Sequence, residues 1–219
     1  MEVLEHAGSR PRPGPGGLVK IHFHYSLHGF SNVYLVGNEL TGDAFVVDPA
    51  DFTRDILVAV EESGWYIRAV LVTHNHEHHV RGLSTLRSIY DATVFAANAS
   101  VGGQSCRVVR DGERFEVCGM RAEALSVPGH SSDSIVYRVE RVLFTGDTLE
   151  AGAIGSTLSR YGGNLLRQGL AQKVLSQDES CVILPGHGPP STVLAERRFN
   201  LGFDPALKRK ESERYDFFV

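Results

Sequence analysis

The feature that most constrains this chain is a run of histidines directly behind an apolar segment. Residues 73–79 read Thr-His-Asn-His-Glu-His-His, which places His74, His76, His78 and His79 within six positions. A buried core accommodates one hydrogen-bonded imidazole, but four together would leave ring nitrogens unpaired, or repelling one another when protonated. Neutral imidazole is the commonest metal ligand, and zinc or iron gives each nitrogen an electron-pair acceptor. The cluster therefore predicts a metal site, with a solvated polar loop or an adventitious metal-binding tract as the alternatives.

The surrounding sequence places these histidines at the end of a strand. Residues 67–72 are apolar and rich in β-branched side chains, which is typical of a buried strand, and Gly82 precedes a helical pattern. Three later motifs repeat this arrangement, each with a possible metal ligand beside a glycine after an apolar segment. They contain His130, Asp147 and His187. Glycine lets the backbone turn sharply and pass close to a metal, so four such motifs strengthen the metal-site prediction.

The alternation of strand and helix patterns predicts an α/β or α+β fold with two sheets between helices. The expected strands cover residues 19–24, 33–37, 44–48, 67–72, 93–97, 115–117, 121–127, 134–139, 142–145 and 181–184. The expected helices cover residues 53–63, 83–90, 164–176 and 191–200. The first of these helices should begin after an N-cap at Thr53 and stop at Gly64.

The composition predicts one globular domain between two polar ends. Of the 219 residues 42% are hydrophobic and 22% are charged, as in ordinary globular proteins. Residues 1–17 are rich in proline and glycine and should form a flexible segment. Residues 18–204 should form a single domain, and residues 205–219 a charged tail whose terminal apolar side chains pack on that domain.

Charge and cysteine content exclude several classes of partner. The net charge is −4 without a long basic block, which argues against nucleic-acid binding. No apolar run reaches the length of a membrane span, and the N-terminus lacks the apolar core of a signal peptide. Cys106, Cys118 and Cys181 are an odd number without a CxxC motif, so we expect no disulfide framework and a cytoplasmic location. The remaining partner is a small-molecule substrate, and the sequence indicates no oligomeric state.

On these motifs the chain resembles the metallo-β-lactamase-fold hydrolases. Their signature is Thr-His-x-His-x-Asp-His, followed by a His, a bridging Asp and a final His, each at a strand end. The resemblance covers about residues 18–200. Gly-Asp-Thr-Leu around Asp147 and Leu-Pro-Gly-His-Gly-Pro-Pro around His187 look most like the glyoxalase II-like (hydroxyacylglutathione hydrolase) branch. The resemblance implies a four-layer αββα sandwich.

The resemblance also implies a set of metal ligands, with one departure from the family pattern. The family's Asp in the first motif is His78 here, which makes the second site one unit more positive and favours borderline metals. We expect His78 to be a genuine ligand, and the neighbouring Glu77 to point elsewhere. One or two zinc ions are expected, with iron or manganese as other options. The implied ligands are His74, His76 and His130 for a first ion, His78, His79 and His187 for a second, and Asp147 as the bridge.

The function implied is a metal-dependent hydrolase that uses metal-bound hydroxide on a thioester, ester or lactone carbonyl of a small molecule. Asp147 and Asp48 are the candidate catalytic residues. Asp147 would orient the nucleophile. Asp48 ends the expected strand 44–48, and it would either fix a ligand histidine or form a turn before Pro49.

The substrate is less well defined by the sequence. Glyoxalase II relatives commonly carry a basic residue nine positions after the bridging Asp, where this chain has Ser156, and Glu150 replaces a usual aromatic residue. The missing cation argues against an anionic glutathione-type substrate, although Arg160 and Tyr161 lie nearby in the sequence. Two other functions stay open: a persulfide dioxygenase-like oxidoreductase with mononuclear iron, and a catalytically silent protein that keeps the fold.

Overall fold

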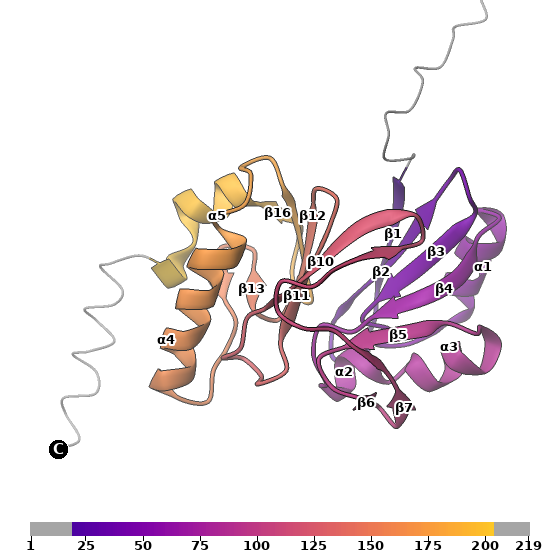
Figure 1. The fold of residues 1–219 in the computed structure, drawn as a ribbon, viewed down its shortest axis with the longest axis horizontal. Coiled ribbons are helices and arrows are strands. Elements are labelled where there is room, and N and C mark those ends of the chain that lie inside the picture. The colour runs from indigo at the N-terminus through magenta and orange to yellow at the C-terminus, as the bar shows by residue number, and fades with distance from the viewer. Residues whose placement is uncertain (1–18, 204–219) are drawn as a thin grey trace, which may run out of the picture.

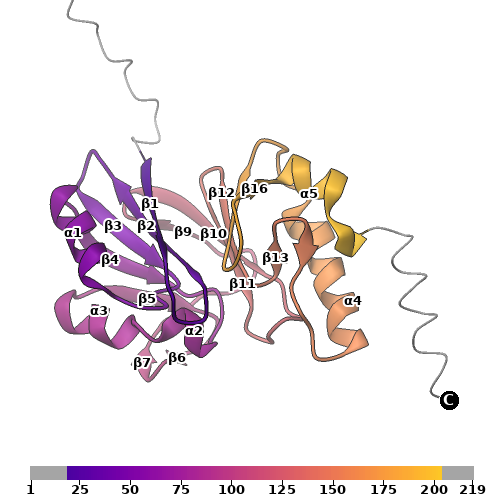
Figure 2. The same ribbon diagram turned by 180° about the vertical axis from the view of Figure 1, so that it is seen from behind.

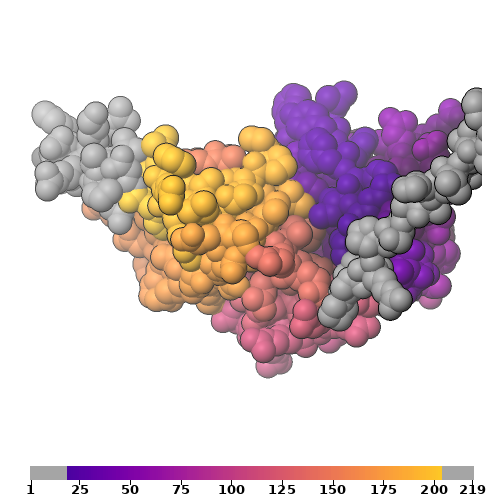
Figure 3. All heavy atoms as spheres, turned by 90° about the horizontal axis from the view of Figure 1, so that it is seen from above, coloured from indigo at the N-terminus to yellow at the C-terminus, as the bar shows by residue number. Residues whose placement is uncertain are grey.

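The computed structural model describes residues 19–203, which form four layers in the order helix, sheet, sheet, helix. Figures 1 and 2 show the layers from opposite sides, with the first sheet and its helices at one end and the second sheet and its helices at the other. Seen from above in Figure 3, the N-terminal half and the C-terminal helices lie at opposite ends of the molecule. The expected αββα sandwich is thus confirmed.

The first sheet is built from the N-terminal half of the chain, with antiparallel pairs at one edge and parallel strands beyond β3. In spatial order it contains β1 (Val19–Tyr25), β2 (Asn32–Asn38), β3 (Asp43–Val47), β4 (Tyr66–Leu71), β5 (Thr93–Ala96) and β8 (Arg107–Val108). Its helices are α1 (Arg54–Glu62), α2 (Glu77–Val80) and α3 (Leu83–Ile89). A small hairpin of β6 (Ser100–Val101) and β7 (Gln104–Ser105) completes this half.

The second sheet is built from the C-terminal half. In spatial order it contains β16 (Ser191–Thr192), β15 (Val182–Pro185), β12 (Val142–Gly146), β11 (Ile135–Val139), β10 (Met120–Ser126) and β9 (Arg114–Val117). Only β12 and β15 run parallel to each other. A two-stranded hairpin consists of β13 (Leu149–Glu150) and β14 (Ala153–Ile154). The helices are α4 (Arg160–Gly169), a π-helical turn over Leu170–Val174, α5 (Val193–Phe199) and a 3₁₀ turn over Leu201–Phe203.

Three apolar cores separate the four layers. Along β3, Ala44 and Val46 belong to the core under the N-terminal helices, while Phe45 and Val47 belong to the core between the two sheets. This alternation follows from the period of two in a strand, and because both faces are covered the strand is apolar throughout. The third core contains Leu166 of α4 packed with residues of the second sheet and α5. The sandwich therefore holds each sheet rigidly, with the strand ends free to carry loops.

Two details of the helices differ from the sequence prediction. Thr53 has the extended backbone of an N-cap, but its side chain makes no capping bond, and its buried Oγ1 has no hydrogen-bond partner among the described residues. The expected helix 191–200 begins instead with β16, because residues 191–192 pair with β15 before Thr192 caps α5. Gly64 ends α1 as expected, with a φ of 65° that suits glycine.

Some predictions lie outside or at the limit of the described residues. The flexible segment over 1–17, the domain limits of 18–204 and the tail over 205–219 stay predictions, because residues 1–18 and 204–219 are not described. All three cysteines are free, as expected. Among residues 19–203, none of the helices is long and apolar enough to cross a membrane.

Candidate metal centre

The N-terminal half contributes four histidines from one loop and one helical turn. Parallel strands β3 and β4 end side by side, and the chain after β4 passes Thr73 and His74 before it enters α2. Asp48, directly after β3, accepts hydrogen bonds from the backbone N of Thr73 at 2.7 Å and from its Oγ1 at 2.6 Å. The strand end is therefore fixed at the point where the histidines begin.

The C-terminal half contributes one side chain from each of three strand ends. His130 follows β10, Asp147 follows β12 and His187 follows β15. The last two loops leave adjacent parallel strands and are joined by a hydrogen bond of 2.9 Å from Gly186 N to Gly146 O. A Cβ atom on Gly186 would lie 2.3 Å from Asp147 Oδ1, so glycine is required for this close approach.

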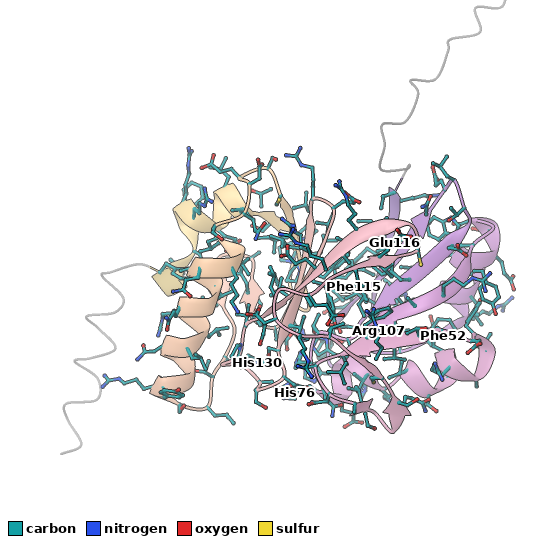
Figure 4. The ribbon with its side chains drawn as sticks, in the orientation of Figure 1. Phe52, His76, Arg107, Phe115, Glu116 and His130 are labelled. Carbon is teal, nitrogen blue, oxygen red and sulfur yellow. The ribbon has the colours of Figure 1, made fainter. Side chains whose placement is uncertain are left out.

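The first group of possible ligands combines both halves. His76 Nδ1 lies 2.9 Å from His74 Nε2 and 3.2 Å from His130 Nε2, while both of those Nε2 atoms lie 3.7 Å from Asp147 Oδ2. These four ligand atoms all lie within 4.8 Å of one another. Figure 4 shows His76 and His130 coming from opposite halves to the same edge of the sandwich. The three histidines and Asp147, expected to act together, are brought together by the fold.

The second group gathers around the same carboxylate, and the ligand atoms of His78, His79 and Asp147 lie within 4.8 Å of one another and of His74. His79 Nε2 is 3.0 Å from Asp147 Oδ1, and His78 Nε2 and His187 Nε2 are 3.4 and 3.3 Å from Asp147 Oδ2. The ring of His78 is 4.4 Å from that of His79 and 5.3 Å from that of His187, measured between centroids. His78, the departure from the family pattern, therefore faces the second group and not solvent alone.

In three of the rings, the nitrogen that faces away from Asp147 makes a hydrogen bond that fixes the tautomer. His130 Nδ1 lies 2.9 Å from Ser156 O and His187 Nδ1 lies 3.0 Å from Phe30 O, and a carbonyl oxygen can only accept. Thr73 Oγ1 gives its hydrogen to Asp48 and so accepts from His74 Nδ1 at 3.0 Å. In its neutral form each of these rings therefore carries its hydrogen on Nδ1 and leaves the lone pair of Nε2 facing the centre, as metal-binding histidines do.

Several buried atoms of the centre have no hydrogen-bond partner among the described residues. They are both ring nitrogens of His79 and Oδ1 of Asp147, whose mutual contacts lack hydrogen-bond geometry. Lone pairs of His74 and His130 also face His76 Nδ1 at 2.9 and 3.2 Å, close to the spacing of about 3.3 Å between tetrahedral ligands on 2.0–2.1 Å bonds. Buried nitrogen and oxygen atoms of this type can offer their lone pairs to a bound metal cation.

The electrostatics differ between the two groups. Burial lowers the pKa of His74 to about 3, with His79 adding to the effect, so this ring is neutral at pH 7. Burial alone would lower the pKa of His79 as well, but the carboxylates of Asp147 and Asp48 outweigh it and raise that pKa to about 9. Burial alone would raise the pKa of Asp147, but His187 and His79 hold it well below its usual range. Asp147 is therefore an anion.

Asp48 and Glu77 are placed behind and outside the centre. Asp48 Oδ2 lies 3.3 Å from His79 Nδ1, on the side of the ring away from Asp147, so its position suits orientation of His79 and not contact with a substrate. It also begins a turn, since Ala50 N donates to Asp48 O. Glu77 is exposed and its carboxylate lies 3.9 Å from His28, away from the ligand groups, as expected.

The sequence did not indicate which groups accept the hydrogen bonds from Nδ1 of His74, His130 and His187. Thr73 belongs to the first motif, and its place between Asp48 and His74 could have been inferred from that motif. The carbonyl oxygens of Ser156 and Phe30 carry no side-chain signal, so only the fold reveals them. Phe30 has a φ of 56°, an uncommon conformation for a non-glycine residue, at the point where its carbonyl meets His187.

The family of the chain follows from this fold and site. The family model of the Metallo-beta-lactamase superfamily matches residues 27–101 and 103–187. The chain belongs to the metallo-beta-lactamase superfamily, which confirms the resemblance drawn from its motifs.

Its relatives include proteins with and without a named activity. The uncharacterized protein Rv2581c of Mycobacterium tuberculosis is 30% identical over 203 residues, which cover 77% of this chain and 91% of that protein. A hydroxyacylglutathione hydrolase of Klebsiella pneumoniae is 35% identical over 132 residues, which cover 59% of this chain and 52% of the hydrolase. The match thus spans about half of the hydrolase.

Solved structures give the same fold. ETHE1 from Myxococcus xanthus is 25% identical, with a TM-score of 0.74 and coverage of 83% of both chains. TTHA1623 in a di-iron-bound form is also 25% identical, with a TM-score of 0.65 and coverage of 78% of this chain and 94% of that one. The fold family and the histidine–aspartate cluster together imply a metal cofactor.

Proposed function

We propose that this protein is a metal-dependent hydrolase that cleaves a thioester, ester or lactone bond in a small molecule. The observation that carries the proposal is the convergence of six histidines on the carboxylate of Asp147. A metal ion bound there would make hydroxide available near neutral pH and polarise the carbonyl under attack. The expected metal is zinc, in one or two copies, with iron or manganese as alternatives.

The residues of the chain would hold and orient this centre. Asp147 would contact both ions, while the Nδ1 donors of His130 and His187 keep their Nε2 atoms turned inward. Asp48 would act as a positioning residue through His79. The proposed ligands are those expected from the sequence: His74, His76 and His130 for the first ion, and His78, His79 and His187 for the second.

The loops beside the centre favour a substrate without strong negative charge. The segment that contacts His130 carries Ser156, not a basic residue, and continues to the fully exposed Leu158. On the other side, Phe30 contacts His187 through its carbonyl and leaves 65% of its own surface exposed. Exposed apolar side chains on the two loops that contact His130 and His187 suit an uncharged acyl group. We place the activity in the cytoplasm, because the three free cysteines suit a reducing compartment.

Metal analysis paired with two activity assays tests this proposal. Purified protein should contain zinc and hydrolyse a small neutral thioester, and a chelator should abolish the activity until zinc is restored. Protein that is fully loaded with metal but hydrolyses none of a panel of thioesters, esters and lactones would contradict it.

The second candidate is a persulfide dioxygenase-like oxidoreductase with mononuclear iron. It is favoured by the first group, which is complete without His78, whereas His78 itself is 33% exposed. Iron-loaded protein that consumes oxygen in the presence of a glutathione persulfide, and hydrolyses no thioester, would select this candidate. Folded protein that binds no metal would favour the catalytically silent alternative.

A further inference from the structure

The turn between β1 and β2 lies against both of the loops that carry the exposed histidines of the second group. It covers residues 26–31 and is closed by a hydrogen bond of 2.9 Å from Ser26 N to Ser31 O. On one side it reaches α2, the short helix that carries His78 (Figure 2). On the other side it reaches the loop after β15 that carries His187. Because these two loops come from opposite halves of the chain, the turn is placed to join them.

The side chain of Ser31 binds the backbone of His78. Ser31 is fully buried, and its Oγ donates to His78 O at 2.6 Å. A second carbonyl, His28 O, lies farther from the same Oγ, at 3.2 Å. In a longer helix the partner of His78 O would be Gly82 N, but Gly82 N donates to Pro49 O instead. The hydroxyl therefore satisfies a carbonyl for which the four-residue helix α2 provides no donor.

The backbone of the turn also packs on the side chain of His78. Gly29 has a φ of 69°, and a Cβ atom at this position would lie 2.3 Å from His78 Cβ. Glycine is thus needed here both for the left-handed backbone and for the close approach. The turn therefore restricts where His78 Cβ can lie, on the side of the residue away from Asp147.

The end of the same turn holds the loop of His187. Phe30 O accepts the hydrogen bond from His187 Nδ1 at 3.0 Å. Asn32, the first residue of β2, is buried, and its Nδ2 donates to Pro185 O at 2.9 Å and to Gly188 O at 2.8 Å. The backbone is thus held on both sides of His187, and the ring itself is held through Nδ1.

We propose that Ser31 is a positioning residue for the second metal ion, because it fixes His78 to the same turn that fixes His187. This role presupposes the two-ion site proposed above. The two histidines are partly exposed and belong to different halves, yet their ring centroids lie 5.3 Å apart. Phe30 and Ser31 are neighbours in the chain, so a shift at one contact shifts the other. The turn thereby sets the spacing of two ligands that one ion must share.

Calorimetric titration of metal-free protein with zinc tests this role without relying on activity. Ser31→Ala removes the hydroxyl and should weaken binding of the second ion about tenfold, with a change of at most about twofold for the first ion. Ser31→Thr keeps the hydroxyl and should recover most of the loss. Ser88→Ala is the matched control, because Ser88 Oγ on α3 also donates to a helix carbonyl, Thr85 O, at 2.7 Å. This control should leave both affinities unchanged.

Exchange of the His187 Nδ1 proton with solvent gives a second readout. In zinc-saturated protein, NMR can follow this proton, which Phe30 O protects. Ser31→Ala should speed its exchange, while the Nδ1 proton of His130, bonded to Ser156 O, should exchange as in the wild type. Both protons belong to ligand rings, so His130 is an internal control for the first group.

The outcomes separate the role of Ser31 from the two-ion site itself. Thermal melts of each metal-free variant verify folding. Wild-type affinity for the second ion in Ser31→Ala, or an equal loss for both ions, would overturn the positioning role and leave the two-ion site standing. A wild-type protein that binds no second ion would instead contradict the two-ion site, and the role of Ser31 with it.

Discussion

The two candidate sites use the same kinds of ligand but differ in the charges around them. In the first, His74 and His130 each donate from Nδ1 to a fixed oxygen, and the ring of His74 is buried. In the second, His187 also donates from Nδ1 to a fixed oxygen, but His79 lies between two carboxylates, and no hydrogen bond fixes Nδ1 of the partly exposed His78 within the described residues. The two sites thus differ less in how their rings are held than in charge, on which the second site depends more.

The protonation of the histidines differs between the two sites in the same way. Burial is the main reason that the pKa of His74 and that of His76 are lowered, so these two rings are neutral at pH 7. In the second site the pKa of His187 is raised by its hydrogen bond to Asp147, and that of His79 is raised by its two carboxylates. A second metal ion must therefore displace protons that a first ion does not meet.

The largest effect is expected from the loss of Asp147, the residue that the two sites share. Asp147→Ala should lower hydrolysis by about 10³-fold or more and reduce bound metal at both sites, because it removes a carboxylate that contacts both groups. Turnover and metal content, measured with circular dichroism as a check on the fold, test this. The exposed Asp178→Asn is the control, and it should change neither. Unchanged turnover at full metal occupancy would make Asp147 a turn residue only.

A smaller effect is expected from a substitution that weakens metal binding at the second site more than at the first. Asp48→Asn leaves the shape of the side chain but removes the charge facing His79, so the second ion should bind about 10- to 100-fold more weakly. The first ion should be affected much less. Asp51→Asn is a matched control from the same loop, since Asp51 contacts Ser26 and His24 instead. Calorimetric titration with zinc measures both steps, and an equal loss at both would mean that Asp48 acts mainly through Thr73 and His74.

How much of this could be predicted from sequence differs between the two halves. The four histidines of the N-terminal half lie within six positions and follow an apolar strand, so local pattern alone indicated a metal site. His130, Asp147 and His187 are far apart in the chain, and each motif alone is weak evidence. Their convergence depends on the order of β10, β12 and β15 in the sheet, which the family resemblance supplied and periodicity did not.

The parts that sequence missed are short or made by the backbone. The two-residue strands, such as β13 and β16, are too short to show a periodic pattern. The carbonyl groups of Phe30 and Ser156 act without their side chains, so residue type gives no indication of their contacts.

A third effect tests the charge of the second site directly. His78→Asp should tighten the second ion about tenfold, because an anion offsets repulsion between the ions that a neutral imidazole cannot. The expected gain is moderate, since the His78 side chain is 33% exposed and solvent screens the added charge. Binding of the first ion should change little. Titration of zinc into the metal-free wild type and variant measures this, and a second ion bound no better by the variant would refute the charge argument.

The smallest expected effect is the pH dependence of binding at the second site. The affinity for the second ion should change at most about tenfold for each pH unit. Because His79 has a pKa of about 9 in the metal-free protein, binding of the second ion near pH 7.5 should release about one proton from it, while the first ion releases none from His74, whose pKa is about 3. Calorimetry in buffers of different ionisation enthalpy counts the protons at each step.

The same shift gives metal-free protein its own pH dependence of stability. The pKa of His79 is raised from 6.5 to about 9 by folding, so its contribution to stability is complete below about pH 6.5 and is lost as the pH rises through about 9. Thermal melts between pH 6 and pH 9.5 should therefore show a falling melting temperature for metal-free protein, and a flatter profile once both sites are loaded. Equal proton release at the two binding steps would contradict this difference in charge between the two sites.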